Sequence, residues 1–178
     1  MTVLSDAQIR ALLRAGDAYD RAAVLLMLGS GMRVGEVVAL RWADCQDGRL
    51  TVHGKGSKTR RVEPGMVAMR AVNALPRTEQ RVFPMSVGTL KWRMSRLAER
   101  TSMPFHGHLL RHSFAMRFIH LGGTIEELSR LLGHAKLDTT LIYLRADSEE
   151  RSLASQRAHN PADALLGGDG GKVVPFRR

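Results

Sequence analysis

The sequence predicts a mainly α-helical domain with one small antiparallel β-sheet in the form of a hairpin. Its 178 residues are enough for about one domain. Helix-starting signals precede apolar segments along most of the chain, whereas short alternating segments occur between Trp42 and Pro64. We expect one folded domain over residues 1–165 and a flexible, glycine-rich tail over residues 166–178.

The first predicted elements are helices. A capping box that begins at Ser5 starts a short helix, because its first and fourth residues can satisfy each other's backbone N–H groups. Asp17 precedes the nearly all-apolar stretch 22–28, which predicts a buried helix that ends at the glycine-containing turn 29–31. Another short helix is expected over residues 34–40, with its start against that turn.

The sheet is expected next, and further helices follow it. Segments 49–53 and 59–63 alternate in polarity and flank a glycine-rich, basic tip at 54–58, which is typical of a β-hairpin. Beyond the hairpin, apolar residues return to helical spacing. The expected helices cover residues 65–75, 86–101, 107–121, 124–133, 138–146 and 148–158.

The chain is strongly basic. It has 27 Lys and Arg against 17 Asp and Glu, a net charge of +10, and a pI near 10.9. Five of the basic residues are Lys and 22 are Arg. This balance favours a polyanionic partner such as nucleic acid, because one guanidinium group can donate two parallel hydrogen bonds to a phosphate. A GC-rich genome, which encodes Arg in preference to Lys, is the alternative explanation.

Several classes of protein are excluded on sequence grounds. No apolar run approaches the roughly 18 to 20 residues of a membrane span, so we expect no membrane partner. The segment Met1–Asp6 has neither a basic region nor an apolar region typical of a signal peptide, which predicts a cytoplasmic protein. Cys45 is the single cysteine, so an internal disulfide and a cysteine-rich zinc module are both excluded.

The spacing of residues argues against two other kinds of site, a phosphate-binding P-loop and a histidine metal site. In the glycine-rich tail, Leu166 stands where a P-loop has its first glycine and Val173 where it has its hydroxyl residue. His108 and His112 are spaced for one helical face and His106 is near them, but no further ligand is apparent. We therefore expect neither a metal nor another cofactor.

Six polar residues remain, each at the end of an expected element. They are Arg33, Lys55, His108, Arg111, His134 and Tyr143. Arg33 opens a helix after a glycine turn, where a phosphate would also meet backbone N–H groups. His108 and Arg111 lie one helical turn apart and therefore share a face. Each also has an ordinary structural explanation: Arg33 could pair with Glu36, the histidines could be capping or core residues, and the tyrosine could be core.

Taken together, these residues belong to motifs that occur in one family. The motifs are Gly31-Met32-Arg33-Val34-Gly35-Glu36-Val37 with Leu40-Arg41-Trp42, Gly54-Lys55-Gly56-Ser57-Lys58, His108-Leu109-Leu110-Arg111-His112-Ser113-Phe114-Ala115, and Leu131-Leu132-Gly133-His134 followed by Asp138-Thr139-Thr140 and Tyr143. From about Gly29 to Tyr143, in family order, the sequence resembles the catalytic domain of the tyrosine recombinases, the phage-type integrase family.

The resemblance implies a DNA strand-transfer enzyme that needs neither metal nor ATP. Tyr143 would attack a DNA phosphodiester and form a 3′-phosphotyrosyl bond, which preserves the energy of the broken strand for rejoining. Arg33 and Arg111 would hold the non-bridging oxygens and stabilise the charge of the transition state. Lys55 would protonate the departing 5′-oxygen, and Glu36 would brace the site.

The resemblance also assigns the histidines and the hairpin cations. His108 would be a general base or proton relay and His134 would hydrogen-bond the phosphate, because a tyrosine with a pKa of about 10 needs help to lose its proton. Lys58, Arg60 and Arg61 would contact the phosphate backbone. The alternative for these three is a solvated, charged strand, and Lys58 is also a rival candidate for the general acid.

The implied partner is double-stranded DNA, on which the chain would form a homo-oligomer, from dimer to tetramer, at a prokaryotic nucleoid or on phage or plasmid DNA. Family members usually carry a core-binding domain before the catalytic domain, and the 32 residues before Arg33 are too few for it. We therefore expect a minimal recombinase, a partner that supplies that domain, or a truncated copy. The helix at 148–158 and the tail at 166–178 fit the family's exchange of C-terminal segments between subunits.

Site-specific recombination is the favoured function, as integration, excision, inversion or resolution of DNA. Two alternatives remain. A DNA-binding regulator would keep the fold without cleaving DNA, and replacing Tyr143 would then change nothing. A type IB topoisomerase-like enzyme would use the same chemistry to relax supercoils with little sequence preference.

Overall fold

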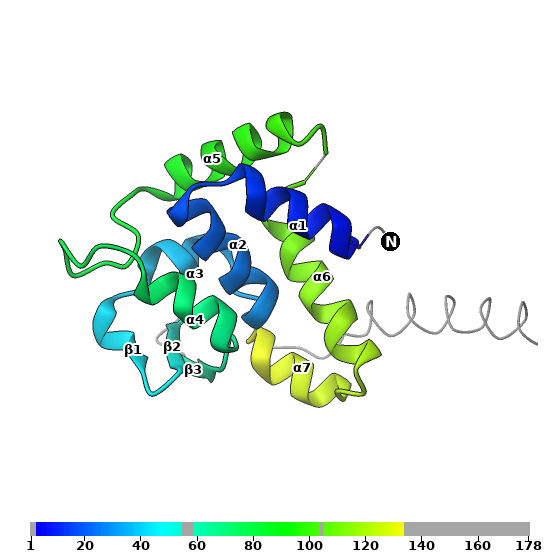
Figure 1. Ribbon diagram of the computed structural model, residues 1–178. Coiled ribbons are helices and arrows are strands. Elements are labelled where there is room, and N and C mark those ends of the chain that lie inside the picture. The colour runs from blue at the N-terminus through cyan, green and yellow to red at the C-terminus, as the bar shows by residue number, and fades with distance from the viewer. Residues whose placement is uncertain (1–2, 55–58, 104, 134–178) are drawn as a thin grey trace, which may run out of the picture.

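The computed structural model describes residues 3–54, 59–103 and 105–133. The elements of this part of the chain are α1 (Asp6–Ala15), α2 (Ala18–Ser30), α3 (Val34–Ala39), the 3-10 turn η1 (Trp42–Asp44), β1 (Cys45–Gln46), β2 (Arg49–His53), β3 (Thr59–Val62), α4 (Met66–Asn73), α5 (Val87–Arg100), α6 (Gly107–His120) and α7 (Ile125–Leu132). The predicted fold class, mainly helical with a small antiparallel sheet, is confirmed (Figure 1). The predicted helices at 138–146 and 148–158 and the tail lie outside the described residues.

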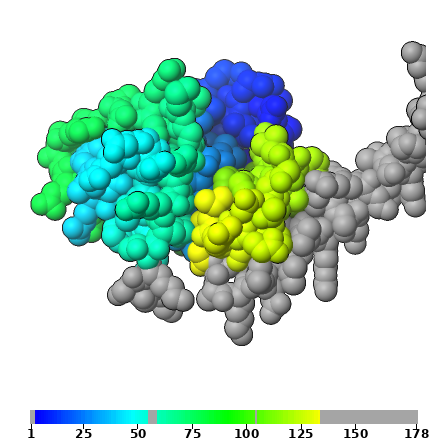
Figure 2. All heavy atoms as spheres, turned by 90° about the horizontal axis from the view of Figure 1, so that it is seen from below, coloured from blue at the N-terminus to red at the C-terminus, as the bar shows by residue number. Residues whose placement is uncertain are grey.

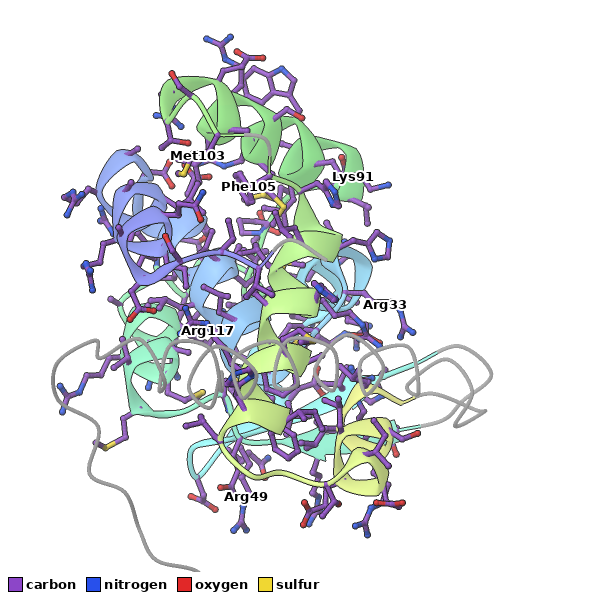
Figure 3. The ribbon with its side chains drawn as sticks, turned by 90° about the vertical axis from the view of Figure 1, so that its right-hand side faces the viewer. Arg33, Arg49, Lys91, Met103, Phe105 and Arg117 are labelled. Carbon is purple, nitrogen blue, oxygen red and sulfur yellow. The ribbon has the colours of Figure 1, made fainter. Side chains whose placement is uncertain are left out.

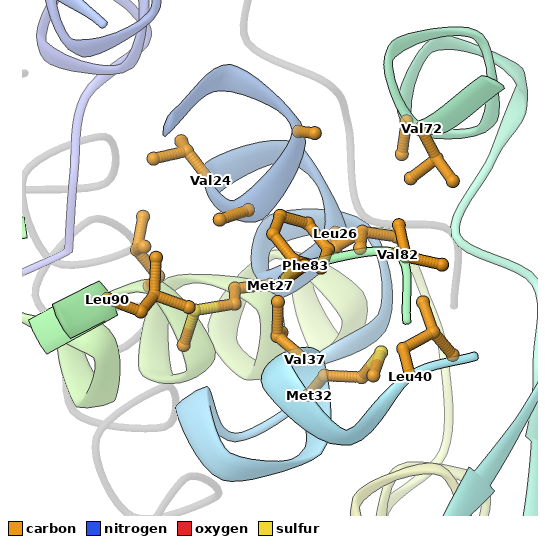
Figure 4. Packing of buried hydrophobic residues seen from close by; sticks show 14 of the residues in the cluster. Val24, Leu26, Met27, Met32, Val37, Leu40, Val72, Val82, Phe83 and Leu90 are labelled. Atoms are coloured by element: carbon orange, nitrogen blue, oxygen red, sulfur yellow. The ribbon is translucent and has the colours of Figure 1, made fainter. Parts of the chain in front are cut away.

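Helix α2 is the centre of the packing. It contacts α1, α3, α4 and α6, with α1 and α5 toward one end of the molecule and the sheet and α7 toward the other (Figure 1). Its apolar side chains, including the fully buried Leu26 and Met27, meet residues of α3, α5 and the segment around Phe83 (Figure 4). Burial of this surface is the main contribution to stability, because apolar surface on every side of α2 is removed from contact with water.

The ends of the helices follow the predicted capping signals. At α1, Ser5 Oγ accepts from Gln8 N at 3.2 Å, while the Gln8 side chain accepts from Ser5 N at 2.8 Å. At the C-terminal end of α2, Gly31 adopts the left-handed conformation with φ of 65°. A Cβ at Gly31 would lie 2.6 Å from both Leu132 Cδ2 and Phe114 Cδ1, so only glycine fits this turn. The turn therefore brings α2 close to α6 and α7.

The sheet has the strand order β1-β2-β3, and both pairs are antiparallel. In the β2–β3 register, Leu50 faces Val62 and Val52 faces Arg60. Leu50, Val52 and Val62 are buried, so one face of the hairpin covers the core. The sequence did not predict β1 or η1, because a two-residue strand and a single 3-10 turn are too short to show a period.

Among the residues that the structure places, no helix combines the length and apolar character needed to cross a bilayer.

Candidate active site

A pocket of about 470 Å³ lies between the start of α3, α5 and the start of α6. Three residues predicted for the site, Arg33, His108 and Arg111, line it together. Its apolar lining includes Met27, Val34, Met94 and Phe105. Arg33 and Phe105 are labelled in Figure 3. The other predicted residues, Lys55, Lys58, His134 and Tyr143, lie outside the residues that the structure describes.

Arg111 is buried and held by the ends of two helices. Its side chain projects from α6, and the residue is 4% exposed. Arg111 Nη1 donates to Gly31 O at 2.6 Å, and Nη2 donates to Leu132 O at 2.9 Å. The last carbonyls of a helix lack partners within that helix and carry its negative dipole end, so both favour a buried cation. The guanidinium is therefore fixed in place before any substrate arrives.

Arg33 occupies the N-cap position of α3 and reaches the pocket from its other side. Its backbone N–H donates to Glu36 Oε2 at 2.8 Å, and Nη1 donates to Glu36 Oε1 at 3.3 Å. The alternative interpretation of Arg33, a pair with Glu36, is thus correct as a contact. It does not remove Arg33 from the pocket, because the side chain is 45% exposed and lines the pocket while it contacts Glu36.

The carboxylate of Glu36 is bound mainly by Arg60 of β3. Arg60 Nη1 and Nη2 donate to the two Glu36 oxygens at 2.9 and 2.8 Å. Burial alone would raise the pKa of the Glu36 carboxyl, but hydrogen bonds from Arg60 and from the Arg33 backbone, with the charges of both arginines, lower the pKa below its ordinary value. These contacts hold Glu36 as an anion between Arg33 and Arg60, and its bracing role stays a prediction.

The solvated-strand interpretation is wrong for Arg60. Its side chain is 12% exposed, and Nε donates to Leu131 O at 2.6 Å in addition to the bonds with Glu36. A phosphate contact at Arg60 stays a prediction, as does one at Lys58. Arg61, the next residue, is exposed.

The histidines are distributed over the first turns of α6. His108 is exposed at the pocket, and His106, the N-cap of α6, has its ring centroid 6.4 Å from that of His108. His112 is half-buried, and burial lowers the pKa of its imidazole, because the charged form loses hydration. Within the described ranges, no three His, Cys, Asp or Glu side chains lie together as a potential metal site.

Lys91 of α5 was missed by sequence reasoning. It lines the same pocket as Arg33 and is exposed (Figure 3). An exposed lysine on an amphipathic helix is ordinarily a solvated residue, so no local signal distinguishes it. Only the packing of α5 beside α3 places this cation at the pocket.

Comparisons with known proteins identify the family of this chain. The profile of the phage integrase family matches residues 2–150. The protein "Tyrosine recombinase XerC" of Xanthomonas campestris pv. campestris is 36% identical over 155 residues, which cover 79% of this chain and 48% of that protein. The protein of the same name from Pseudomonas aeruginosa is 33% identical over 170 residues, which cover 85% of this chain and 55% of that protein. The chain thus spans about half the length of these curated relatives.

Solved structures with the same fold point in the same direction. The XerA recombinase structure superposes with a TM-score of 0.76 at 25% identity, covering 88% of this chain and 65% of that one. The structure of a lambda integrase dimer bound to a COC′ core site gives a TM-score of 0.67 at 19% identity, with coverage of 80% and 47%. The second likeness bears on the fold alone. From the profile match, the motifs and the pocket, we conclude that this chain belongs to the phage integrase family of tyrosine recombinases.

Proposed function

We propose that this chain is the catalytic domain of a site-specific DNA recombinase that cuts and rejoins DNA through a 3′-phosphotyrosine intermediate. The observation that carries the proposal is the convergence of Arg33 and Arg111 on one pocket from two different helices, with His108 beside them. Arg111 is a buried cation that the ends of two helices hold at that pocket, and a guanidinium in such a place can donate charge-assisted hydrogen bonds to a phosphate. The curated relatives named above, each called a recombinase, point to the same reaction.

The proposed chemistry divides among six residues. The Tyr143 phenolate attacks phosphorus and forms a P–O bond, while the bond to the 5′-oxygen breaks and Lys55 supplies the proton that this oxygen takes. Arg33 and Arg111 hold the non-bridging oxygens, so the charge that develops on them meets guanidinium groups already in place. His108 and His134 assist as proton relay and phosphate donor. Rejoining is the reverse reaction with a second 5′-hydroxyl as nucleophile.

The proposed partners are double-stranded DNA and further copies of the chain, from dimer to tetramer. The structures of XerH recombinase bound to its palindromic difH substrate and of a lambda integrase dimer bound to a COC′ core site share this fold and support that proposal. We assign residues 1–165 to the catalytic domain and residues 166–178 to a tail. Cytoplasmic action on nucleoid, phage or plasmid DNA belongs to the same proposal.

Covalent trapping tests the proposal. Wild-type protein and Tyr143→Phe are incubated with nicked DNA drawn from the flanking sequence of the gene, because the nick lets the cleaved end diffuse away and prevents rejoining. We expect a covalent protein–DNA adduct on a denaturing gel for wild type alone. Binding by both proteins with no adduct would favour the regulator, and relaxation of supercoiled plasmid without strand exchange would favour the topoisomerase-like enzyme.

A further inference from the structure

Arg60 lies at the point where β3 meets α3 and α7. Its Nε donates to Leu131 O at 2.6 Å, near the end of α7, and its two Nη atoms donate to the Glu36 carboxylate at 2.9 and 2.8 Å. The side chains of Arg60 and Glu36 are 12% and 9% exposed. A guanidinium bound by a buried fork of this kind has one geometry, since planar donors match the carboxylate plane.

One partner of Arg60 also binds Arg33, and the other lies next to the carbonyl that binds Arg111. The Glu36 oxygens accept from the Arg33 backbone N–H at 2.8 Å and from Arg33 Nη1 at 3.3 Å. Leu132 O, the carbonyl after the one that Arg60 holds, accepts from Arg111 Nη2 at 2.9 Å. Arg60 is therefore linked to Arg33 through a shared carboxylate and to Arg111 through successive carbonyls of α7.

The end of α7 leaves space for this guanidinium. Gly133, the C-cap, has φ of 64°, and a Cβ there would lie 3.3 Å from Arg60 Nη1 and 3.4 Å from Arg60 Cδ. Helix α7 packs directly against β3, and Figure 2 shows the two side by side on one face. Arg60 also faces Val52 in the hairpin ladder, close to the tip at 54–58. One side chain thus joins the hairpin, α3 and the end of α7.

We propose that Arg60 is a positioning residue of this site and does not contact the DNA backbone. Through Glu36 it sets the position of Arg33, and through the Leu131 carbonyl it fixes the end of α7 beside Arg111. A phosphate contact would require Arg60 to give up both of its bonds to the buried Glu36 carboxylate, which would keep only its contacts with Arg33, and this loss is costly. The catalytic part of this inference rests on the proposed recombinase function.

The same sheet contains a matched control. Arg49 on β2 also pairs with a glutamate, since its Nε lies 2.7 Å from Glu63 Oε1. Their side chains are 62% and 67% exposed, however, and Figure 3 shows Arg49 well away from Arg33. Such a surface pair contributes little, so Arg49→Gln removes an arginine without disturbing the pocket.

The test compares Arg60→Gln with Arg49→Gln in the full chain. Single-turnover adduct formation on saturating nicked DNA gives the cleavage rate, and fluorescence anisotropy at several salt concentrations gives Kd. We expect Arg60→Gln to slow cleavage by about 10- to 100-fold, because small misplacements of positioned groups have effects of this size. Its Kd should stay within about threefold of wild type, and the dependence of log Kd on log salt should keep its slope, while Arg49→Gln cleaves at the wild-type rate.

The opposite pattern would overturn the proposal. A phosphate contact at Arg60 predicts weaker binding, a salt slope reduced by about 0.9, and a wild-type cleavage rate at saturating DNA. Arg60→Lys guards against misfolding of the glutamine variant, because an ammonium can bind Glu36 but cannot also reach the Leu131 carbonyl. Its cleavage rate should lie between those of wild type and Arg60→Gln, and a wild-type rate would count against positioning.

Amide hydrogen exchange separates this proposal from the proposed function. If Arg60 fixes the end of α7, the backbone amides of residues 125–133 should exchange faster in Arg60→Gln than in wild type, and those of Arg49→Gln should exchange at the wild-type rate. This outcome does not depend on whether the protein cleaves DNA. Faster exchange in a protein whose wild type forms no adduct would refute the recombinase and retain the positioning contact. Unchanged exchange and unchanged cleavage by Arg60→Gln, with an active wild type, would refute the positioning role alone.

Discussion

Replacing Arg111 with lysine tests whether the pocket depends on a fixed guanidinium fork or on positive charge alone. The two carbonyls that Arg111 binds, Gly31 O at 2.6 Å and Leu132 O at 2.9 Å, belong to the ends of different helices. A lysine ammonium can reach one of them. The variant therefore loses one charge-assisted hydrogen bond, which is about 1.5–3 kcal/mol of stability. At about 2–4 °C per kcal/mol for a chain of this length, the Tm should fall by about 3–12 °C.

The effect on cleavage should be much larger than this loss of stability explains. A protein with an unfolding free energy of about 5 kcal/mol or more stays over about nine-tenths folded after losing 3 kcal/mol. Loss of a preorganised donor to the transition state, by contrast, slows reactions by about 10²–10³-fold. We therefore expect Arg111→Lys to form the covalent adduct about 100-fold more slowly at saturating DNA. Urea unfolding and single-turnover trapping measure the two effects, and a rate within about threefold of wild type would refute the role of Arg111.

Three further predictions concern stability and are read from urea unfolding. Gly31→Ala should lower the free energy of unfolding by about 2–4 kcal/mol, because its φ is positive and its new Cβ would overpack against neighbouring side chains. Gly48→Ala, with φ of 76° and nothing within 4 Å of its Cβ, should lower it by about 1 kcal/mol. Equal losses would contradict this explanation. Asp20→Asn should cost about 1.5–3 kcal/mol, because Asp20 is a buried carboxylate bonded to an α5 guanidinium at 2.9 Å. Glu99→Gln, in an exposed pair, should cost under about 1 kcal/mol, and a larger loss there would count against burial as the cause. The pKa of Glu36 is lowered in the folded state, so the stabilisation that its ionised form provides is present above its ordinary pKa and is lost as pH falls through the folded-state pKa. The loss of unfolding free energy in Glu36→Gln, relative to wild type, should therefore shrink from about pH 5 downward. A loss that stays constant with pH would exclude this titration.

The local features of the fold could be predicted from the sequence, because each depends on residues near each other in the chain. The capping boxes at Ser5 and Thr124 begin helices where expected, and the turn at Gly31 ends one. The hairpin strands were also predicted to within one residue. Their signals are periods and caps that span a few positions, which tertiary contacts did not override.

The contacts that build the site could be predicted only in part. The resemblance to the family named Arg33, His108 and Arg111, and the structure brings these three together at one pocket. The contacts of Arg60 with Glu36 and the Leu131 carbonyl had no sequence signal, because these partners lie 24 and 71 positions away. The cation Lys91 was missed for the same reason, since its place at the pocket depends on how α5 packs.

The carbonyls at the ends of α2 and α7 explain how a basic protein can bury a guanidinium at this pocket. Arg111 and Arg60 bind successive carbonyls of α7, so the C-terminus of that helix is held by cations from two other elements. Helix C-termini favour positive charge, and the hydrogen bonds offset the desolvation of the buried groups. The same contacts fix the last described turn before His134.

Peptide mapping of the trapped adduct tests the central claim most directly. After cleavage of nicked DNA, nuclease and protease digestion leaves one peptide that carries the attached nucleotide, and mass spectrometry locates the modified residue. The proposed mechanism predicts a 3′-phosphate ester on the Tyr143 hydroxyl. An adduct on any other residue, or DNA cleavage with no covalent protein product, would contradict it.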